Sequence, residues 1–276
     1  MNGGVLAAGR PRQGALLGGS HPPTGGGMLA AMAQRTYEQI LIDADNTILN
    51  FAVCERRILE TMAREFGFMP WTTDGEDLTA AYRRINASLW RDLEQGAIQP
   101  DELKVERFRR LIDLLDFTAI SRPVAPEFLN MQFIMRLKQC PEVVPTAMPV
   151  VASIAPVVVI TNGFADVQRP RLEGSGLMPY ISHVFISEEI GAAKPQRAFF
   201  DHVLRELGNP DPARCLVVGD SLSSDIAGGT AAGMDTVWFD RSEMLGETAP
   251  PPGEQTPTYR ITRLVELREI VGIDPA

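Results

Sequence analysis

The stretch that decides the fold is QILIDADNT, at residues 39–47. Its first half is a short apolar run bounded by polar residues, which is typical of a strand buried on both faces. Its second half places two carboxylates and a hydroxyl directly after that strand. Because ligands of an open parallel sheet bind at the carboxyl ends of its strands, this stretch predicts a central strand and part of a binding site.

Further along the chain, short apolar segments alternate with helical patterns. We expect strands at residues 157–160, 184–187, 214–219, 235–239 and 259–261, with helices between several of them. Strands separated by helices indicate parallel βαβ units with right-handed crossovers. The predicted fold class is therefore α/β, with a Rossmann-like doubly wound parallel sheet.

A long helical region follows the first strand, with apolar residues at helical spacing and no convincing strand. About four helices fit there, which predicts a four-helix-bundle cap domain at residues 54–135. The core domain is expected at residues 36–53 and 136–276. Residues 1–35 are rich in glycine and show no helix or strand period, so we expect a disordered tail.

The composition limits the class of protein and its partners. The chain has 276 residues with a formal net charge of −9, 45% hydrophobic and 22% charged residues, which excludes a collagen-like or wholly disordered chain. The acidic balance argues against a polymeric nucleic acid as partner, because such a surface needs a basic stripe. The longest apolar stretch, Val150–Ile160, is far shorter than the roughly 20 residues of a membrane helix, so no membrane partner is expected.

Three cysteines, Cys54, Cys140 and Cys215, lie far apart in the chain, and no CxxC pair is present. An odd number of scattered cysteines predicts reduced thiols in an intracellular protein. No secretory signal is visible near the N-terminus, so the expected location is the cytoplasm. The sequence leaves open whether the protein is a monomer or a homodimer.

Polar side chains follow several of the expected strands at the point where each strand ends. They are Asp43, Asp45 and Thr47, then Thr161, Asn162 and Gly163, then Lys194, and finally Asp220 and Asp225. Carboxylates gathered in one crevice repel each other unless a cation offsets their charge. A hard dication with oxygen ligands is the natural candidate, so Mg²⁺ is the expected cofactor. With a lysine, a hydroxyl and free backbone N–H groups, the site suits a phosphoryl group, which predicts a small phosphomonoester as substrate.

Four elements of this pattern carry a family resemblance. They are Asp43-x-Asp45-x-Thr47, Thr161, Lys194-Pro195, and Gly219-Asp220 with Asp225 five residues further on. The pattern resembles the haloacid dehalogenase (HAD) superfamily over about residues 36–276, and the helical insertion resembles its C1 cap. The resemblance implies a Rossmannoid core and Mg²⁺-dependent phosphoryl transfer through an aspartyl-phosphate.

The resemblance also implies the catalytic roles. Asp43 would be the nucleophile that attacks phosphorus. Asp45 would protonate the leaving oxygen and later activate water, and its backbone carbonyl would contact Mg²⁺. Lys194 would pair with Asp43 and with the phosphate. A carboxylate at the Asp45 position separates phosphatases from the true dehalogenases, which resemble this pattern but lack that residue.

The remaining matched residues would bind phosphate and metal. By the resemblance, Thr161 and the backbone at Asn162 and Gly163 would hold phosphate oxygens. Asp220 would be a metal ligand, with Asp225 ligating directly or through water. The metal site implied is therefore formed by Asp43, Asp45, Asp220 and Asp225.

Longer stretches indicate a branch of the superfamily. Residues 43–51, 85–98, 160–164 and 186–195 look like the pyrimidine 5′-nucleotidases, which implies activity on pyrimidine nucleoside 5′-monophosphates such as dUMP, UMP and dTMP and modified analogues. Asn46 departs from the acidic residue expected at its position, which puts substrate preference rather than chemistry in question. The alternatives are a HAD phosphatase for phosphoglycolate or a sugar phosphate, and a non-catalytic interaction protein on the same scaffold. The presence of every motif carboxylate argues against the latter.

Residues of the cap must select the substrate, because the phosphate site cannot. Trp90 and Asn86 are the candidates for contacts with a base, together with Phe51 and Phe164, although aromatic residues at helical spacing are more often core. Three arginines, Arg83, Arg84 and Arg107, could steer an anion. We interpret these arginines as part of a solvated helix face.

Overall fold

The computed structural model describes Met1 and residues 36–115, 124–242 and 256–273. The predicted tail at residues 1–35 therefore lies outside the described residues, apart from Met1. The chain from Gln34 onward forms one compact unit, and the description below concerns that unit.

Six parallel strands form one sheet in the order β3-β2-β1-β4-β5-β6. Their bounds are Gln39–Asp43 (β1), Val157–Thr161 (β2), Ile181–Ile186 (β3), Cys215–Gly219 (β4), Asp235–Phe239 (β5) and Tyr259–Ile261 (β6). The stretch at residues 39–47 supplies a central strand, as predicted, since β1 pairs with β2 on one side and β4 on the other. The predicted doubly wound parallel sheet is confirmed. The third strand begins three residues earlier than expected.

Alternating residues of the central strands pack on opposite faces of the sheet. In β1, Leu41 belongs to one hydrophobic cluster, while Ile40 and Ile42 belong to another. The same alternation holds in β4, where Val217 joins Leu41 and its neighbours face the other way. Because a strand has a side-chain period of two, an uninterrupted apolar run is required wherever both faces are covered.

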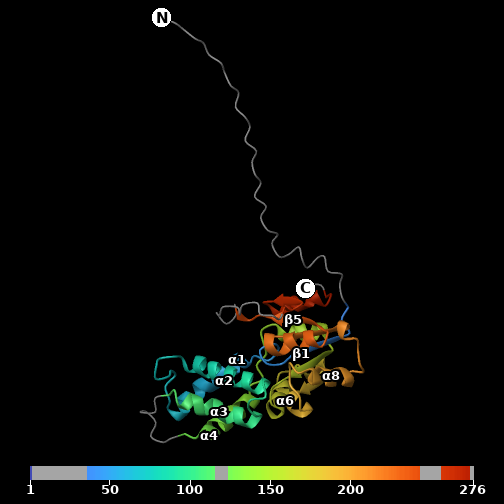
Figure 1. The fold of residues 1–276 in the computed structure, drawn as a ribbon. Helices are drawn as coiled ribbons and strands as arrows, with labels where there is room; N and C mark the ends of the chain where they lie inside the picture. Colours follow the sequence, from blue (N-terminus) through green and yellow to red (C-terminus); the bar gives the residue numbers. More distant parts are fainter. Residues whose placement is uncertain (2–35, 116–123, 243–255, 274–276) are drawn as a thin grey trace. The chain divides into compact units, whose positions relative to one another are not determined.

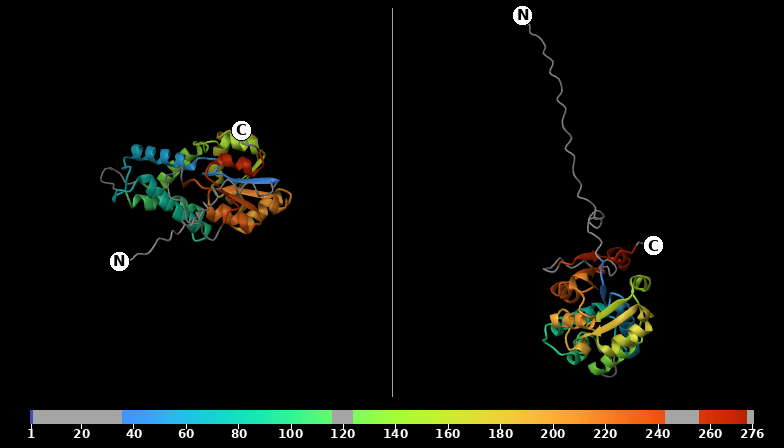
Figure 2. Two further views of the ribbon diagram at one scale, coloured as in Figure 1. Left: turned by 90° about the horizontal axis from the view of Figure 1, so that it is seen from above. Right: turned by 90° about the vertical axis from the view of Figure 1, so that its right-hand side faces the viewer.

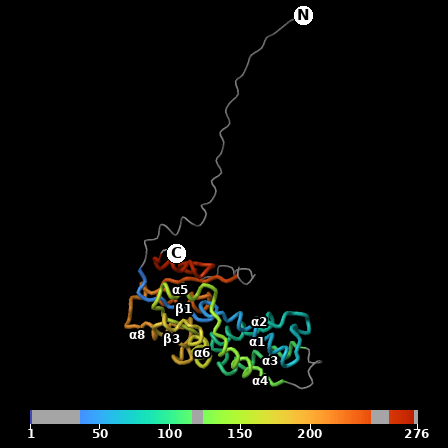
Figure 3. Tube along the Cα trace, turned by 180° about the vertical axis from the view of Figure 1, so that it is seen from behind, coloured from blue at the N-terminus to red at the C-terminus, as the bar shows by residue number. Residues whose placement is uncertain are grey.

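Helices cover both faces of this sheet. The bounds are Ala147–Ile154 (α5), Ala165–Gly174 (α6), Ser187–Ile190 (α7), Arg197–Glu206 (α8), Ala227–Ala231 (α9) and Leu267–Ile270 (α11), the last preceded by a short 3₁₀ turn at Leu264–Glu266. Val150 and Leu172, from α5 and α6, pack in the cluster with Ile42, whereas Phe199 and Phe200 of α8 pack with Leu41. Figure 3 shows α5 and α8 on either side of β1. The two layers leave the ends of the strands open for a site.

A helical insertion separates β1 from β2, and we refer to it as the cap. Its helices in the described residues are Phe51–Phe66 (α1), Leu78–Glu94 (α2), Pro100–Ile112 (α3) and Pro126–Lys138 (α4), which agrees with the predicted helical region. They share one apolar cluster that includes Tyr82, Phe108 and Phe133. Figures 1 and 2 show these helices grouped beside the sheet. The domain boundaries at residues 54 and 135 stay a prediction.

Local signals in the sequence explain where the cap helices begin and end. Asp77 caps α2, because its side chain accepts hydrogen bonds from the backbone N–H groups of Thr79 and Ala80, both at 3.0 Å. Pro100 begins α3 at a position where its missing N–H is not needed. Gly67 ends α1 with a φ of 75°, in the left-handed region that glycine adopts without strain.

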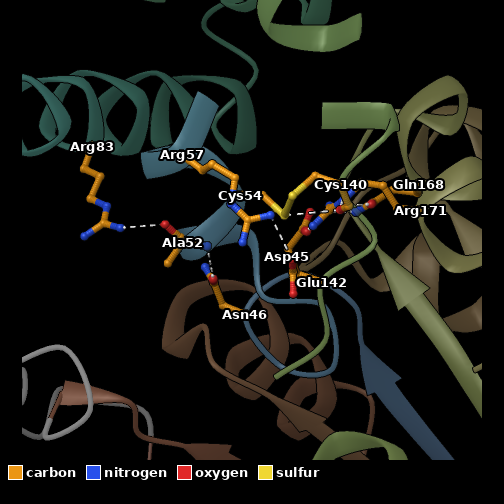
Figure 4. Close-up of a disulfide and its surroundings, with 10 residues drawn as sticks. All are labelled: Asp45, Asn46, Ala52, Cys54, Arg57, Arg83, Cys140, Glu142, Gln168 and Arg171. Carbon is orange, nitrogen blue, oxygen red and sulfur yellow. Dashed lines mark hydrogen bonds and ion pairs between the residues drawn. A yellow bond between two sulfur atoms is a disulfide. The ribbon is translucent and has the colours of Figure 1, made fainter. Parts of the chain in front are cut away.

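Two linkers join the cap to the core, and they run side by side. The backbone N–H of Asn50 donates to the carbonyl of Glu142 at 2.7 Å, and Leu49 forms an antiparallel bridge with Val143. Next to them, a disulfide joins Cys54, in the first turn of α1, to Cys140 on the linker that leaves the cap, with their Cα atoms 5.9 Å apart (Figure 4). The prediction of reduced, unpaired cysteines was wrong for this pair, because a sequence separation of 86 hides their proximity. Cys215 is a free, buried cysteine of β4.

The disulfide predicts a thiol count and a stability difference. We expect the unreduced, unfolded protein to react with one equivalent of a thiol reagent and the reduced protein with three. Because the bond closes a long loop, its removal in Cys54→Ser should lower the free energy of unfolding by about 2–4 kcal/mol in denaturant titrations. Cys215→Ser is the control and should retain the disulfide. Three reactive thiols in the protein purified without reductant would contradict the pairing.

Candidate active site

The predicted polar residues converge at the carboxyl ends of the central strands. Asp43 ends β1 and Thr161 ends β2, while Asp220 directly follows β4. Lys194 lies in the segment between α7 and α8, and Asp225 lies in the short helical turn Leu222–Ile226 after β4. All five line one cavity, although they span more than 180 positions of the sequence. The parallel topology produces this convergence, because it puts every strand's carboxyl end at one edge.

The ammonium of Lys194 is the centre of this group. Its Nζ donates to Asp43 Oδ1 at 2.6 Å, to Asp225 Oδ1 at 2.7 Å and to the carbonyl of Ile160 at 3.1 Å. The lysine side chain is only 2% exposed. The side chain of Asn162 holds the lysine backbone in place, accepting from its N–H at 2.9 Å and donating to its carbonyl at 2.8 Å. Sequence reasoning predicted the Lys194–Asp43 pair but not the contact with Asp225.

Three carboxylates gather around a common point. Asp43, Asp220 and Asp225 each offer an oxygen, and these atoms lie within 4.8 Å of one another. Gly219 makes room for this arrangement, because a Cβ atom there would lie 2.1 Å from Asp225 Oδ2. An all-oxygen, anionic donor set of this kind fits a hard divalent cation. The side chain of Asp45 is not part of this carboxylate group.

Burial and mutual repulsion disfavour the charged form of these acids. Burial raises the pKa of Asp43 well above its usual range, and the Asp225 and Asp220 carboxylates add to this effect against the opposing Lys194 ammonium. Burial and the Asp225 carboxylate raise the pKa of Asp220 to about 7. Burial alone would lower the pKa of Lys194, but Asp225 and Asp43 outweigh it and raise it above the ordinary value. One lysine therefore does not offset the local negative charge, and the site favours a further cation.

Asp45 has partners of its own, which come from α6. Arg171 Nη1 donates to Asp45 Oδ1 at 2.5 Å, and Gln168 Nε2 donates to Asp45 Oδ2 at 2.7 Å. Gln168 Nε2 also reaches Thr161 Oγ1 at 2.9 Å. The Gln168 side chain lies over Gly163, where a Cβ atom would approach it to 2.3 Å. Gly163 therefore has a packing role here that the sequence analysis missed.

The cavity extends from these residues into the cap and has a volume of about 240 Å³. Its cap end is largely aromatic and aliphatic, with the residues Phe51, Trp90, Ile134, Leu137, Phe164 and Val167 and the polar side chains of Asn86, Glu94 and Arg107. The rings of Trp90 and Phe164 lie 5.7 Å apart between centroids. Trp90 and Asn86, predicted as substrate contacts, thus share one space with the carboxylates.

The interpretation of Arg107 as a solvated residue was wrong. It is 3% exposed and lines the cavity, and its Nη2 donates to Asn130 Oδ1 at 2.8 Å. Among the described residues, neither Arg107 Nε nor Asn86 Oδ1 has a hydrogen-bond partner, although both atoms are buried. Arg83 and Arg84 instead pair with Glu55 and Glu76. Nothing in the helical pattern distinguishes Arg107 from these two arginines, because only the packing of α3 against α2 and α4 buries it.

The comparisons agree with this geometry. A family model of haloacid dehalogenase-like hydrolases matches residues 37–233, a range that contains the cap helices, the strands β1 to β4 and every residue of the lysine and carboxylate group. The chain belongs to this hydrolase family. The residues of the HAD motifs at the ends of β1, β2 and β4 are the ones that meet in the cavity.

Several known proteins are similar to this HAD hydrolase over most of its length. The HAD-hydrolase YfnB of Bacillus subtilis is 31% identical over 87% of this chain and 97% of its own. The pyrimidine 5′-nucleotidase YjjG of Escherichia coli is 33% identical, covering 85% and 98%, and the pyrimidine 5′-nucleotidase PynA of Streptococcus pneumoniae is 30% identical, covering 81% and 92%. The crystal structure of YfnB matches with a TM-score of 0.75 over 87% of this chain.

No helix among the described residues combines the length and apolar character needed to cross a membrane. The cytoplasmic location stays a prediction, and the choice between monomer and homodimer stays open.

Removing the central lysine should destabilise the protein. We expect Lys194→Met to lower the free energy of unfolding by about 3–5 kcal/mol, because it leaves Asp43 and Asp225 buried without their cation. Lys138→Met is the matched control, since Lys138 pairs with the exposed carboxylate of Asp166, and it should change stability by no more than about 0.5 kcal/mol. Equal effects in denaturant titrations would contradict the importance of the buried pairs.

Proposed function

We propose that the protein is a Mg²⁺-dependent phosphatase that hydrolyses pyrimidine nucleoside 5′-monophosphates through an aspartyl-phosphate. The observation that carries this proposal is the continuous cavity that joins the acid and lysine group of the core to the aromatic end of the cap. The former suits a phosphoryl group, and the latter suits a planar ring. The names of YjjG and PynA, both pyrimidine 5′-nucleotidases, support the same substrate class.

The two acids of the first motif have separate roles in this proposal. A carboxylate oxygen of Asp43 attacks phosphorus, so that a new P–O bond forms and the bond to the nucleoside oxygen breaks. Asp45 gives a proton to that leaving oxygen. In the second step Asp45 takes a proton from water as the water attacks the aspartyl-phosphate, which releases phosphate and restores Asp43. The different partners of the two carboxylates, Lys194 and Arg171, support this division of roles.

The carboxylate group of Asp43, Asp220 and Asp225 would hold Mg²⁺, with the backbone carbonyl of Asp45 as a further ligand. The oxygen donors and their excess negative charge fit this ion. When bound, Mg²⁺ would neutralise charge that develops on the phosphoryl oxygens. The crystal structure of YfnB, which is 30% identical to this chain, contains bound magnesium. This relative therefore supports the assignment of Mg²⁺ here.

The phosphate would be held by Thr161, Asn162, Gly163 and Lys194. Thr161 Oγ1 accepts hydrogen bonds from Gly163 N at 3.1 Å and from Gln168 Nε2 at 2.9 Å. Because both contacts use lone pairs of the hydroxyl oxygen, its own O–H is left to donate to a phosphate oxygen. The buried ammonium of Lys194 adds positive charge at the same place.

A base would lie at the cap end of the cavity, against the aromatic side chains of Trp90, Phe164 and Phe51. The side chains of Arg107 and Asn86 both line this end of the cavity, so the guanidinium can donate to a ring carbonyl and the amide can pair with a neighbouring polar group of the base. A sugar phosphate or phosphoglycolate, the runner-up substrates, would leave these apolar walls and both polar side chains without a substrate contact. The cap end therefore favours a nucleotide.

A substrate panel tests the proposed function. We expect Mg²⁺-dependent phosphate release from dUMP, UMP and dTMP, with larger kcat/KM than for sugar phosphates and phosphoglycolate. Asp43→Asn should abolish turnover and leave the fold intact by circular dichroism, because it removes the nucleophile. Equal or faster hydrolysis of sugar phosphates would contradict the substrate class, and retained turnover by Asp43→Asn would contradict the mechanism.

Arg107 should matter only for substrates that carry a base. We expect Arg107→Met to lower kcat/KM for dUMP by about 10-fold or more, since a hydrogen bond from a charged donor contributes about 1.5–3 kcal/mol. Ribose 5-phosphate should be hydrolysed at an unchanged rate. Arg109→Met, on the exposed face of the same helix, is the control. A parallel loss with both substrates would show that Arg107 serves the fold of the cap instead.

A further inference from the structure

Two side chains of α6, Gln168 and Arg171, hold the carboxylate of Asp45. Asp45 is 30% exposed in its side chain, whereas Arg171 is completely buried. Among the described residues that line the cavity, Asp45 and Gln168 are present and Arg171 is not. The guanidinium therefore contacts Asp45 from behind, where it does not reach a substrate.

The contacts restrict how the Asp45 carboxylate can turn. Arg171 Nη1 binds Oδ1 at 2.5 Å and Gln168 Nε2 binds Oδ2 at 2.7 Å, so a donor occupies each oxygen. Arg171 Nη1 also donates to Gln168 Oε1 at 3.1 Å, which locks the two donors to each other. Each carboxylate oxygen has two lone-pair positions, so one position on each is left to carry or accept a proton.

Arg171 also contacts both linkers of the cap. Its Nε donates to the carbonyl of Cys140 at 3.3 Å, on the linker that leaves the cap. Its guanidinium carbon lies 5.9 Å from the ring centroid of Phe51, the first residue of α1, at the point where the entering linker joins the cap. The Cys54–Cys140 disulfide joins the start of α1 to the leaving linker nearby, and Figure 4 shows Arg171 reaching from α6 towards Cys140 and Asp45.

We propose that Arg171, together with Gln168, is a positioning residue that aims the carboxylate of Asp45 at the leaving oxygen and anchors it to the cap linkers. This proposal rests on the proposed function, because it assigns Asp45 the proton transfers of that reaction. Arg171 acts only through Asp45 and does not touch the substrate. The spacing of Gln168 and Arg171, three residues apart on α6, puts both side chains on the helix face that meets Asp45.

The test compares two substrates that differ in their need for a proton. The best alkyl phosphomonoester of the panel has an alkoxide leaving group, which needs the proton of Asp45. The leaving group of p-nitrophenyl phosphate is a phenolate, which is stable without that proton. We expect Arg171→Gln to lower kcat/KM for the alkyl substrate about 100-fold or more and to change kcat/KM for p-nitrophenyl phosphate much less. Arg171→Lys, which keeps a cationic donor, should recover part of the loss.

The controls separate positioning from folding. Arg169→Gln changes a neighbouring arginine of α6 that forms an exposed pair with Glu189, and it should leave both substrates unaffected. In an Asp45→Asn background, Arg171→Gln should cause little further loss, because both substitutions remove the same proton transfer. If Arg171→Gln does not fold, Gln168→Met, which removes the second donor, should show the same dependence on the leaving group.

The outcomes are distinguishable from those of the proposed function. Equal losses with both substrates, or additive losses in the Asp45→Asn background, would overturn the positioning role while the phosphatase assignment stands. A wild-type protein that releases no phosphate from either substrate would overturn the proposed function itself. Selective, non-additive loss that Arg171→Lys partly reverses would support the proposal.

Discussion

The buried ammonium of Lys194 is the interaction on which the rest of the site depends. It lies between Asp43, at the end of β1, and Asp225, in the turn that follows the neighbouring strand β4, and it also binds the carbonyl of Ile160 near the end of β2. Isolated carboxylates at this depth would be expelled or protonated. The lysine allows them to stay close together, and their remaining excess charge is what makes the site suitable for a cation and a phosphate.

The topology of the sheet determines which residues can share that lysine. β1 lies between β2 and β4, so the residues that follow these three strands meet at one edge. The glycines at 163 and 219 then permit close approach, the first of Gln168 and the second of Asp225. A single methyl group at either position would displace a side chain that holds the site together.

The two acids of the first motif differ in their surroundings although only one residue separates them. Asp43 is held by the core through Lys194, whereas Asp45 is held by α6 and, through Arg171, by the linkers of the cap. One acid is therefore fixed to the sheet, and the other is connected to the domain that covers the substrate. In the proposed reaction this division matches a nucleophile that is fixed to the sheet and a proton-transfer group that is held by contacts extending to the cap.

The sequence by itself determined the class of fold, the position of the central strand and the identity of the motif residues. Strand and helix periods are local, and the motif residues stand directly beside those strands, so both can be read along the chain. Only the tertiary structure decided the Cys54–Cys140 pairing, the burial of Arg107 and the contact of Arg171 with Asp45. Each of these joins segments that are far apart in the sequence, as with the 126 positions between Asp45 and Arg171. Their partners depend on how helices pack, and a helical pattern records only which face is apolar, not what it meets.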